Sequence, residues 1–288
     1  MKDNFPIKNC HRNSTHFPPS LAILPDAPPT LYWRGSLISS SPAIAIVGTR
    51  KASAVGIEYA RSFARALALE GWRIISGLAF GIDAAAHQGA LDSKGITWAV
   101  LAHGLDTIQP RQHEHLADTI LDFGGCLVSE YPPTTPAYPN QFIARNRIIS
   151  ALCDAVIIIE APQKSGALST AHQALRQKKK VFVIPALPSM KQFEGSLSLL
   201  RKGCRMVRTP QDVLEDMGGQ RIKNLSFTEG PPSNERAILQ ALREHTAPLS
   251  IDKLSQITTL SPQEVAVAMT QLVLEGIVVE EQDTYCIR

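Results

Sequence analysis

The stretch that decides the fold is AIAIVGTRKASAVG, residues 43–56. Its first five residues form a continuous apolar run that ends at Gly48, which is the pattern of a strand buried on both faces of a sheet. From about residue 55 to residue 70, apolar side chains recur at helical spacing, and Gly71 is suited to end the helix. A buried strand that turns through glycine into an amphipathic helix predicts the first unit of a parallel α/β sheet.

The same alternation of strands and helices continues through residue 207. We expect strands at residues 73–77, 97–104, 126–130, 155–161, 181–186 and 204–207, and helices at residues 82–91, 113–122, 142–152, 167–177 and 196–202. This spacing predicts a doubly wound, mostly parallel sheet. Right-handed crossovers then bring every loop from a strand to a helix to the carboxyl edge of the sheet, where ligands bind in such folds.

The composition is that of an ordinary globular protein. Of the 288 residues, 44% are hydrophobic and 19% are charged, which disfavours disorder, collagen-like repeats and a coiled coil. No apolar run approaches the ~20 residues that a membrane span needs, and the N-terminus has no apolar signal segment. The five cysteines are scattered without a C-x-x-C pair, so neither a disulfide framework nor a cysteine zinc site is expected. We therefore expect a cytoplasmic protein with reduced thiols.

Four regions are expected along the chain. Residues 1–40 are rich in proline and predict an extended N-terminal arm that ends in a short strand. Residues 41–217 form the α/β domain, and residues 218–232 have the composition of a linker. Residues 233–288 predict three helices followed by a hairpin, which together describe a winged helix.

The winged-helix segment has candidate capping residues for its helices, and its net charge is opposite in sign to that of the rest of the chain. Ser250 is a candidate N-cap, Ser261 and Glu264 form a capping box, and the hairpin is expected to turn at Gln282–Asp283. The segment has four Lys and Arg residues against eight Asp and Glu residues, so it carries −4 while the rest of the chain carries +7. Because the expected recognition helix, residues 261–275, has no Lys or Arg, we predict that this segment binds protein or modulates another site and does not grip duplex DNA.

The loop after the first strand, VGTR, predicts an anion site. Backbone N–H groups at a helix N-terminus attract anions, Gly48 allows a ligand to approach closely, and Arg50 is a bidentate phosphate donor. The loop lacks G-x-G-x-x-G spacing, and no acidic residue ends the second strand, so a dinucleotide fingerprint is absent. A turn that binds nothing is the alternative.

The second loop, SGLAFGID at residues 76–83, combines glycines with an acidic residue. Gly77 and Gly81 permit tight backbone turns. Asp83 is placed either to cap the following helix or to contact a ligand. One turn later, His87 is expected to be a packed or hydrogen-bonded histidine.

The most specific charged feature is the run Arg145, Asn146 and Arg147 at the expected start of an apolar helix. Positive charge there opposes the helix dipole, so helix stability does not explain it. Phosphate binding would explain the run, and so would a buried pair with a carboxylate such as Glu160.

A further loop, KSGALST at residues 164–170, resembles a phosphate cradle because a lysine, a glycine and two hydroxyls precede a helix. The G-x-x-x-x-G-K-[ST] spacing is absent, so ATP hydrolysis has no support. The chain also has no G-x-S-x-G, no H-E-x-x-H and no acidic cluster, so we predict no catalytic residue and no metal ligand.

Taken together, five stretches resemble the DprA family, also called Smf, the DNA-processing proteins A of bacterial natural transformation. The stretches are IAIVGTRKAS, IISGLAFGIDAAAHQGAL, VSEYPP, RNRIIS and IEAPQKSGALSTAHQAL, within residues 17–217. The resemblance implies an extended Rossmann-like domain that binds single-stranded DNA, protects incoming DNA, forms a homodimer and loads the RecA recombinase. It implies no enzymatic reaction and no cofactor.

The resemblance also implies which residues form the DNA site. The motif positions that would bind DNA and its phosphates are Gly48, Thr49, Arg50, Ser76, Gly77, Gly81, Asp83, Arg145, Asn146, Arg147, Lys164, Ser165, Gly166 and Thr170. Glu160 and His87 would shape the pocket. The chain departs from the family pattern at Ile108, Ala144 and Ala186, and the last of these stands where the family has a glycine near the pocket.

Three aromatic residues near this edge, Phe80, Tyr131 and Phe142, would stack on bases, although core packing is the alternative for Phe142. Two other functions stay open. A nucleoside-monophosphate phosphoribohydrolase would use Glu160 as a base, but the P-G-G-x-G-T loop of that group is replaced here by PALPSM. A winged-helix transcription factor with a ligand-sensing α/β domain agrees poorly with a recognition helix that lacks Lys and Arg.

Overall fold

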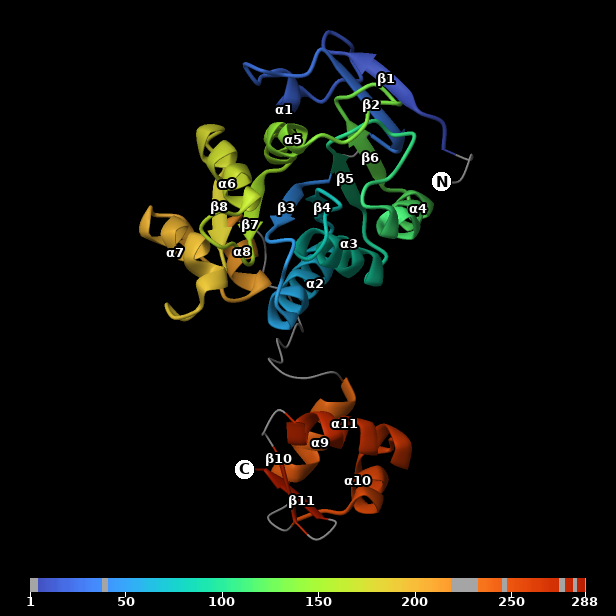
Figure 1. Cartoon of the computed structure of the whole chain (residues 1–288), viewed down its shortest axis with the longest axis vertical. Coiled ribbons are helices and arrows are strands. Elements are labelled where there is room, and N and C mark those ends of the chain that lie inside the picture. Colours follow the sequence, from blue (N-terminus) through green and yellow to red (C-terminus); the bar gives the residue numbers. More distant parts are fainter. Residues whose placement is uncertain are drawn as a thin grey trace. The chain divides into compact units, whose positions relative to one another are not determined.

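The computed structural model describes residues 5–37, 41–218, 233–244, 248–274, 278–281 and 284–287. The chain divides into two compact units, Met1–Leu225 and Ser226–Arg288, and each has its own hydrophobic core (Figure 1). Within the described residues, no helix is long and apolar enough to cross a membrane.

The first unit alternates strands and helices along most of its length. Its strands are β1 Lys8–His11, β2 Thr30–Gly35, β3 Ala43–Val47, β4 Arg73–Ser76, β5 Thr97–Leu101, β6 Cys126–Ser129, β7 Ala155–Ile158, β8 Lys180–Val183 and β9 Arg205–Met206. Its helices are α1 Pro19–Ala22, α2 Ala54–Leu69, α3 Ile82–Asp92, α4 Glu114–Asp122, α5 Pro139–Ala151, α6 Gly166–Arg176, α7 Glu194–Arg201 and α8 Pro210–Asp216, with short 3-10 turns at Arg111–His113 and Lys191–Phe193.

All nine of these strands belong to one sheet, in the order β1-β2-β6-β5-β4-β3-β7-β8-β9. The strands from β6 to β9 in this order are parallel, while β1 and β2 pair antiparallel at one end. The strand order reverses at β3, which pairs with β4 on one side and with β7 on the other. The expected doubly wound, mostly parallel sheet is confirmed, and its switch point lies between β3 and β7.

Helices cover both faces of the sheet, which explains why its central strands are apolar throughout. Ala43, Ala45 and Val47 share one core with α5 and α6, whereas Ile44 and Ile46 point to the opposite face and are fully buried. Figure 1 shows α5 and α6 on one side of the strands and α2, α3 and α4 on the other. Each fully buried isoleucine contributes roughly 1.5–3 kcal/mol of transfer free energy, so β3 is firmly fixed.

The N-terminal arm differs from the extended arm that its prolines predict. Residues 8–11 form β1, which pairs with β2, and β2 in turn extends the sheet beside β6. Phe17, Leu21 and Leu24 between these strands are buried in the core under α5. The sequence KNCH hides β1 because it is an edge strand that buries only Cys10, so it lacks an apolar run.

Helix α5 also begins earlier than its apolar pattern predicts. It starts at Pro139, which occupies the first helical position, and the Tyr138 N–H donates to Oε1 of Gln141 at 2.7 Å. Arg145 therefore lies in the second turn, not at the helix N-terminus. The argument from the helix dipole for an arginine ligand is wrong for this reason.

The second unit contains α9 Ser233–Glu244, α10 Ile251–Thr258, α11 Pro262–Leu274, β10 Val278–Glu281 and β11 Thr284–Ile287. The two strands pair antiparallel, and the predicted caps form, since Ser250 accepts from the Lys253 N–H and the Ser261 N–H donates to Glu264. Three helices and a hairpin agree with the predicted winged helix. The expected hairpin turn at Gln282–Asp283 and residues 219–232 of the expected linker lie outside the described residues.

Candidate nucleic-acid interface

The candidate site lies at the carboxyl edge of the sheet, where the strand order reverses. The loops after β3 and β7 lie against each other there, because the Thr49 N–H donates to the backbone oxygen of Glu160 at 2.7 Å. Both loops lead into helices, α2 capped by Ser53 and α6 capped by Ser165. Two helix N-termini at a topological switch point attract a negatively charged ligand.

The loop after β3 is close-packed at its base and exposed at its tip. A Cβ atom on Gly48 would lie 2.5 Å from Cγ1 of Ile82 and 2.8 Å from the backbone oxygen of Glu160, so only glycine fits. Arg50 is exposed, and its guanidinium carbon lies 4.7 Å from the ring centre of Phe142. This contact orients Arg50 at the edge and leaves its donors accessible to a phosphate.

Glu160 is a structural carboxylate in this arrangement. Its side chain is buried and accepts hydrogen bonds from the Ser53 N–H, at 3.1 Å, and from the Ser53 hydroxyl, at 2.7 Å. Gly56 leaves room for this carboxylate, since a Cβ atom there would collide with Oε2. The alternative to phosphate binding, a buried pair between Glu160 and an arginine of the run 145–147, does not form among the described residues, and Glu160 instead fixes the start of α2.

The backbone of the loop after β4, residues 77–81, forms hydrogen bonds with three side chains. Nη1 of Arg145 donates to the backbone oxygen of Gly77 at 2.9 Å, and the Gly77 N–H donates to Oδ2 of Asp83 at 3.1 Å. Nδ1 of His113 donates to the backbone oxygen of Leu78 at 2.8 Å. Leu78 has a φ of 56°, a strained value for a leucine, and these bonds hold it there.

Arg145 and Asp83 form a buried, charged support for this loop. Burial raises the pKa of Asp83 and lowers the pKa of Arg145 to about 10, while each charge favours the charged form of the other. Arg145 is only 4% exposed, and it also donates to the backbone oxygen of Val100. This placement favours a positioning role for Arg145 over a direct phosphate contact.

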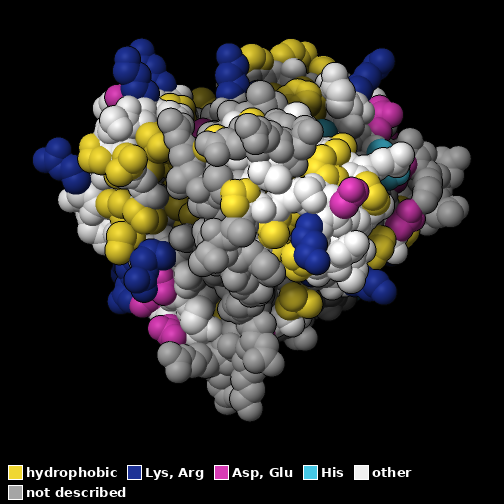
Figure 2. Space-filling view, turned by 90° about the horizontal axis from the view of Figure 1, so that it is seen from below, with side chains coloured by type: hydrophobic (Ala, Val, Ile, Leu, Met, Phe, Trp, Pro, Cys, Tyr) yellow, Lys and Arg dark blue, Asp and Glu magenta, His cyan; other side chains and the backbone are white. Residues whose placement is uncertain are grey.

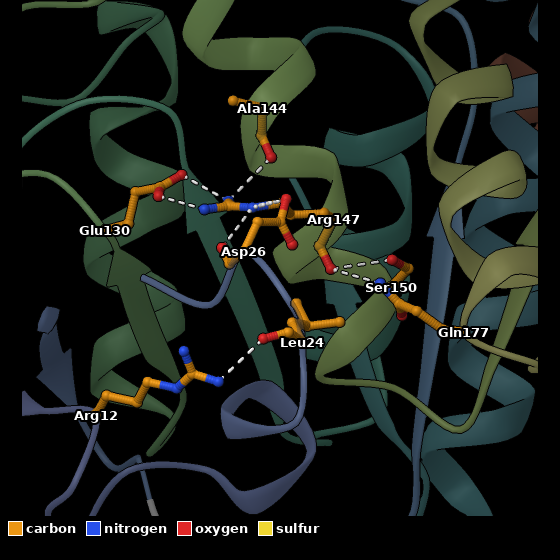
Figure 3. Close-up of polar contacts among 8 residues, drawn as sticks. All are labelled: Arg12, Leu24, Asp26, Glu130, Ala144, Arg147, Ser150 and Gln177. Atoms are coloured by element: carbon orange, nitrogen blue, oxygen red, sulfur yellow. Dashed lines mark hydrogen bonds and ion pairs between the residues drawn. The ribbon is translucent and has the colours of Figure 1, made fainter. Parts of the chain in front are cut away.

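Arg147 is occupied by carboxylates on the other side of α5. Its guanidinium donates to both carboxylate oxygens of Glu130, at 2.8 and 2.7 Å, and pairs with Asp26 at 2.9 Å. Figure 3 shows it lying between these two acidic residues, below the backbone oxygen of Ala144. Arg147 therefore joins α5 to the N-terminal arm, and its two charge partners disfavour a phosphate contact.

The loop after β7 brings together the remaining motif residues. Nδ2 of Asn146 donates to the backbone oxygen of Gly166 at 3.1 Å, and Oγ of Ser165 accepts from the Ala167 N–H at 3.2 Å. Thr170 is buried, whereas Lys164 is exposed at the loop tip. Lys164 and Arg50 are thus the two exposed cations among the predicted site residues.

Two histidines pack behind the site. Nδ1 of His87 donates to Oγ1 of Thr97 at 2.7 Å, and burial, followed by the charges of His113 and Arg145, lowers the pKa of His87 to about 3. His103 is also buried, and burial lowers its pKa. His87 is therefore a neutral packing residue at physiological pH.

Sequence patterns missed several features of the site, including the Ser53–Glu160 cap and the contact between Arg50 and Phe142. Ser76, another predicted site residue, is buried and donates to the backbone oxygen of Ile46. Ala186 has no left-handed φ, so its Cβ causes no strain in the loop after β8. Within the described part of the chain, no group of three His, Cys, Asp or Glu side chains is placed to hold a metal.

On the face drawn in Figure 2, the described basic side chains form no broad patch. Lys and Arg stand there in separate groups among apolar and uncharged side chains. A cavity of about 750 Å³ lies away from the switch point, with Lys8, His11 and Trp33 of β1 and β2 in its lining. Anion binding at the candidate site is therefore expected to depend on the exposed Arg50 and Lys164 and on the N-terminus of α6.

The family model of DNA recombination-mediator protein A matches residues 8–218, and that of the DprA winged helix domain matches residues 228–283. The chain belongs to the DNA recombination-mediator protein A family. Protein Smf of Escherichia coli is 41% identical over 206 residues, which cover 71% of this chain and 55% of that protein, so the chain spans about half the length of this relative.

Two solved structures of this family share the fold. DNA processing protein A from Streptococcus pneumoniae superposes with a TM-score of 0.68 at 36% identity, over 74% of this chain and 75% of that one. DNA processing protein A from Helicobacter pylori, described for its single-stranded DNA binding mode, gives a TM-score of 0.67 at 32% identity, over 75% of this chain and 98% of that one. The expected family membership and fold are confirmed.

Proposed function

We propose that this chain binds single-stranded DNA at the carboxyl edge of β3, β4 and β7, and that it protects incoming DNA and delivers it to a RecA recombinase during natural transformation or recombination. One observation carries the proposal. Arg50 is exposed on the loop after β3, beside Phe142 and the N-terminus of α2. A cation, an aromatic ring and a helix N-terminus together suit a phosphate and an adjacent base.

The proposed contacts do not depend on the DNA sequence. Arg50 and Lys164 neutralise phosphates, and the N-terminus of α6 adds backbone donors. Arg145, Asp83 and Glu160 act behind the loops and hold them in shape. The Helicobacter pylori relative, described for binding single-stranded DNA, supports the choice of ligand.

The role of the winged helix in this proposal follows from its charge. The helix α11 has no Lys or Arg, and its exposed side chains include Gln263, Glu264, Val267 and Thr270. A helix that reads duplex DNA normally presents basic side chains. We therefore assign this unit a protein-binding or modulating role, which also disfavours a duplex-binding transcription factor. A homodimer is part of the proposal because the family resemblance implies it.

A phosphoribohydrolase is the enzyme alternative, and the position of Glu160 disfavours it. A catalytic base must reach the proton that it takes from substrate. The carboxylate of Glu160 is buried and accepts bonds from the N–H and the hydroxyl of Ser53. We therefore propose a binding protein without a catalytic residue at this site.

A gel-shift comparison tests the proposed function. We expect the full chain to shift a 20-nucleotide oligo-dT in preference to a duplex of equal length, and to accelerate RecA assembly on the single strand. An assay for nucleobase release from AMP runs beside it and should show no product. Preference for duplex, or release of adenine, would contradict the proposal.

A further inference from the structure

Phe80 is an exposed aromatic ring on an otherwise tightly anchored loop. Its side chain is 44% exposed, whereas Leu78, two residues earlier, is fully buried in the core beneath α3 and α4. The loop therefore turns Leu78 into the core and leaves the ring of Phe80 at the surface. An exposed aromatic ring offers a flat apolar face to a ligand, and the contacts that fix this ring in place decide whether it can act as a binding surface.

The backbone that carries Phe80 is rigid on both sides. Gly77 is bonded to Arg145 and Asp83, and Leu78 is bonded to His113. After Phe80, the chain passes through Gly81, whose φ of 75° excludes most other residues, and enters α3. Because the loop is fixed before any ligand arrives, little ordering entropy is lost when the ring takes up a contact.

The ring of Phe80 is supported from one side by His113. The two ring centres lie 4.9 Å apart at an interplanar angle of 66°, an edge-to-face contact. Since Nδ1 of His113 is bound to Leu78, the imidazole cannot turn away without losing that bond. His113 thus sets the orientation of Phe80 and leaves the rest of the exposed ring open.

The position of Phe80 connects it to the phosphate loop. A Cβ atom on Gly81 would collide with the backbone oxygens of Thr49 and Arg50, so the two loops touch directly after Phe80. On the other side, the turn that holds His113 begins at the exposed Arg111 and is followed by the exposed Glu114 and His115. The loop of Phe80 therefore has a neighbouring loop on each side, one with the exposed Arg50 and the other with the exposed Arg111. A strand in which bases and phosphates alternate can place a base on the ring and phosphates near these cations.

We propose that Phe80, supported by His113, is a base-stacking platform of the single-stranded DNA site, distinct from the pair formed by Arg50 and Phe142. The inference rests on the proposed function, because its ligand is a base of the bound strand. Stacking uses the face common to all bases, so this platform is tolerant of sequence. Phe80 contributes to affinity by stacking on a base, whereas Arg50 contributes to affinity by contacting a phosphate.

Oligonucleotides with and without bases separate these two contributions. We would measure the affinity of the full chain for a 20-nucleotide oligo-dT and for an abasic oligonucleotide of the same length, which keeps the phosphates and lacks the bases. Phe80→Ala should weaken oligo-dT binding about 5- to 150-fold, since one stacked base is worth ~1–3 kcal/mol, and should leave abasic binding unchanged. The Phe80→Trp variant keeps an aromatic ring at this position, so it should bind oligo-dT about as tightly as the wild type does.

Phe123→Ala is the matched control. Phe123 is 42% exposed, but it follows α4 and precedes β6, at the opposite edge of the sheet, so its substitution should change neither affinity. Equal oligo-dT affinity for wild type and Phe80→Ala would overturn the inference, and so would an equal loss for both ligands. A wild-type chain that binds neither oligonucleotide would overturn the proposed function itself.

Discussion

Nη1 of Arg145 donates to the backbone oxygen of Gly77 at 2.9 Å, from the inner side of the loop that carries Phe80. The bond crosses from α5 to the end of β4, two elements that are far apart in the sequence. With Asp83 beside it, Arg145 holds the second loop in the shape that places it against the loop of Arg50. The binding surface therefore depends on two buried charged side chains that lie behind the loop.

Replacing Arg145 should separate positioning from phosphate contact. Arg145→Met removes two buried hydrogen bonds to backbone oxygens and the positive charge that favours the ionised form of Asp83, so we expect the free energy of unfolding to fall by roughly 2–5 kcal/mol. Affinity for oligo-dT should fall as well, but the salt dependence of binding should keep the wild-type slope, because no phosphate contact is lost. Denaturant unfolding and fluorescence anisotropy over a salt series measure the two effects.

The double variant Arg145→Met with Asp83→Asn provides the control. Removing the unpaired charge should recover part of the lost stability. A salt slope reduced by Arg145→Met as much as by Arg50→Ala would show that Arg145 contacts phosphate after all.

Two glycines at this edge should respond very differently to alanine. Gly81 has a φ of 75°, and a Cβ atom there would collide with the backbone oxygen of Thr49, whereas a Cβ atom on Gly166 meets nothing within 4 Å. Gly81→Ala should therefore lower the melting temperature and oligo-dT affinity, at a cost of at least about 1–3 kcal/mol. Gly166→Ala should leave the melting temperature nearly unchanged. Equal tolerance of the two substitutions in thermal unfolding would contradict this description of the loops.

Stability should depend on pH through His87. Its pKa is about 3 in the folded chain and ~6.5 in the unfolded chain, so the unfolded state binds more protons between these values. The free energy of unfolding should therefore fall as pH falls from about 6.5 toward 4, with His87 contributing up to ~1.4 kcal/mol per pH unit.

His87→Asn isolates this contribution. The asparagine amide can still donate to Thr97, but it does not titrate. Denaturant unfolding at several pH values should give a shallower pH dependence for this variant. An unchanged slope would mean that His87 is not held neutral by burial.

The winged-helix unit should not bind duplex DNA at physiological salt, because the helix α11 offers no cation to phosphates. The unit has its own core, so residues 226–288 can be tested as an isolated fragment. Micromolar or tighter binding of a duplex in an anisotropy assay would refute this prediction. As a positive control, Gln263→Lys with Thr270→Lys adds two cations to the exposed face and should create salt-sensitive duplex binding.

The central sheet could be predicted from the sequence because each of its strands and helices has an apolar pattern within its own few residues. The run 43–47 is apolar at every position since helices cover both faces, and the following helix shows its own spacing. The edge position of the site then follows from the handedness of the crossovers. Strand β1 gave no such signal, because it buries only Cys10.

The roles of the arginines could not be predicted in the same way. Arg145 donates to the backbone oxygens of Gly77 and Val100, and Arg147 pairs with Asp26 and Glu130, all brought together only by the fold. In the sequence, Arg50, Arg145 and Arg147 all lie in motifs of the expected DNA site, and the neighbouring residues do not show which of them is buried. Burial and charge partners separate them, and only Arg50 of the three stays exposed.

The salt dependence of oligo-dT binding tests the central claim most directly. Wild type, Arg50→Ala and Arg176→Ala would be compared by anisotropy, the last as a control because Arg176 is an exposed arginine at the opposite end of α6. If Arg50 neutralises one phosphate of a single strand, Arg50→Ala should lower affinity and reduce the slope of log K against log salt by about 0.7, while Arg176→Ala changes neither. An Arg50→Ala variant with wild-type affinity and slope would contradict the account.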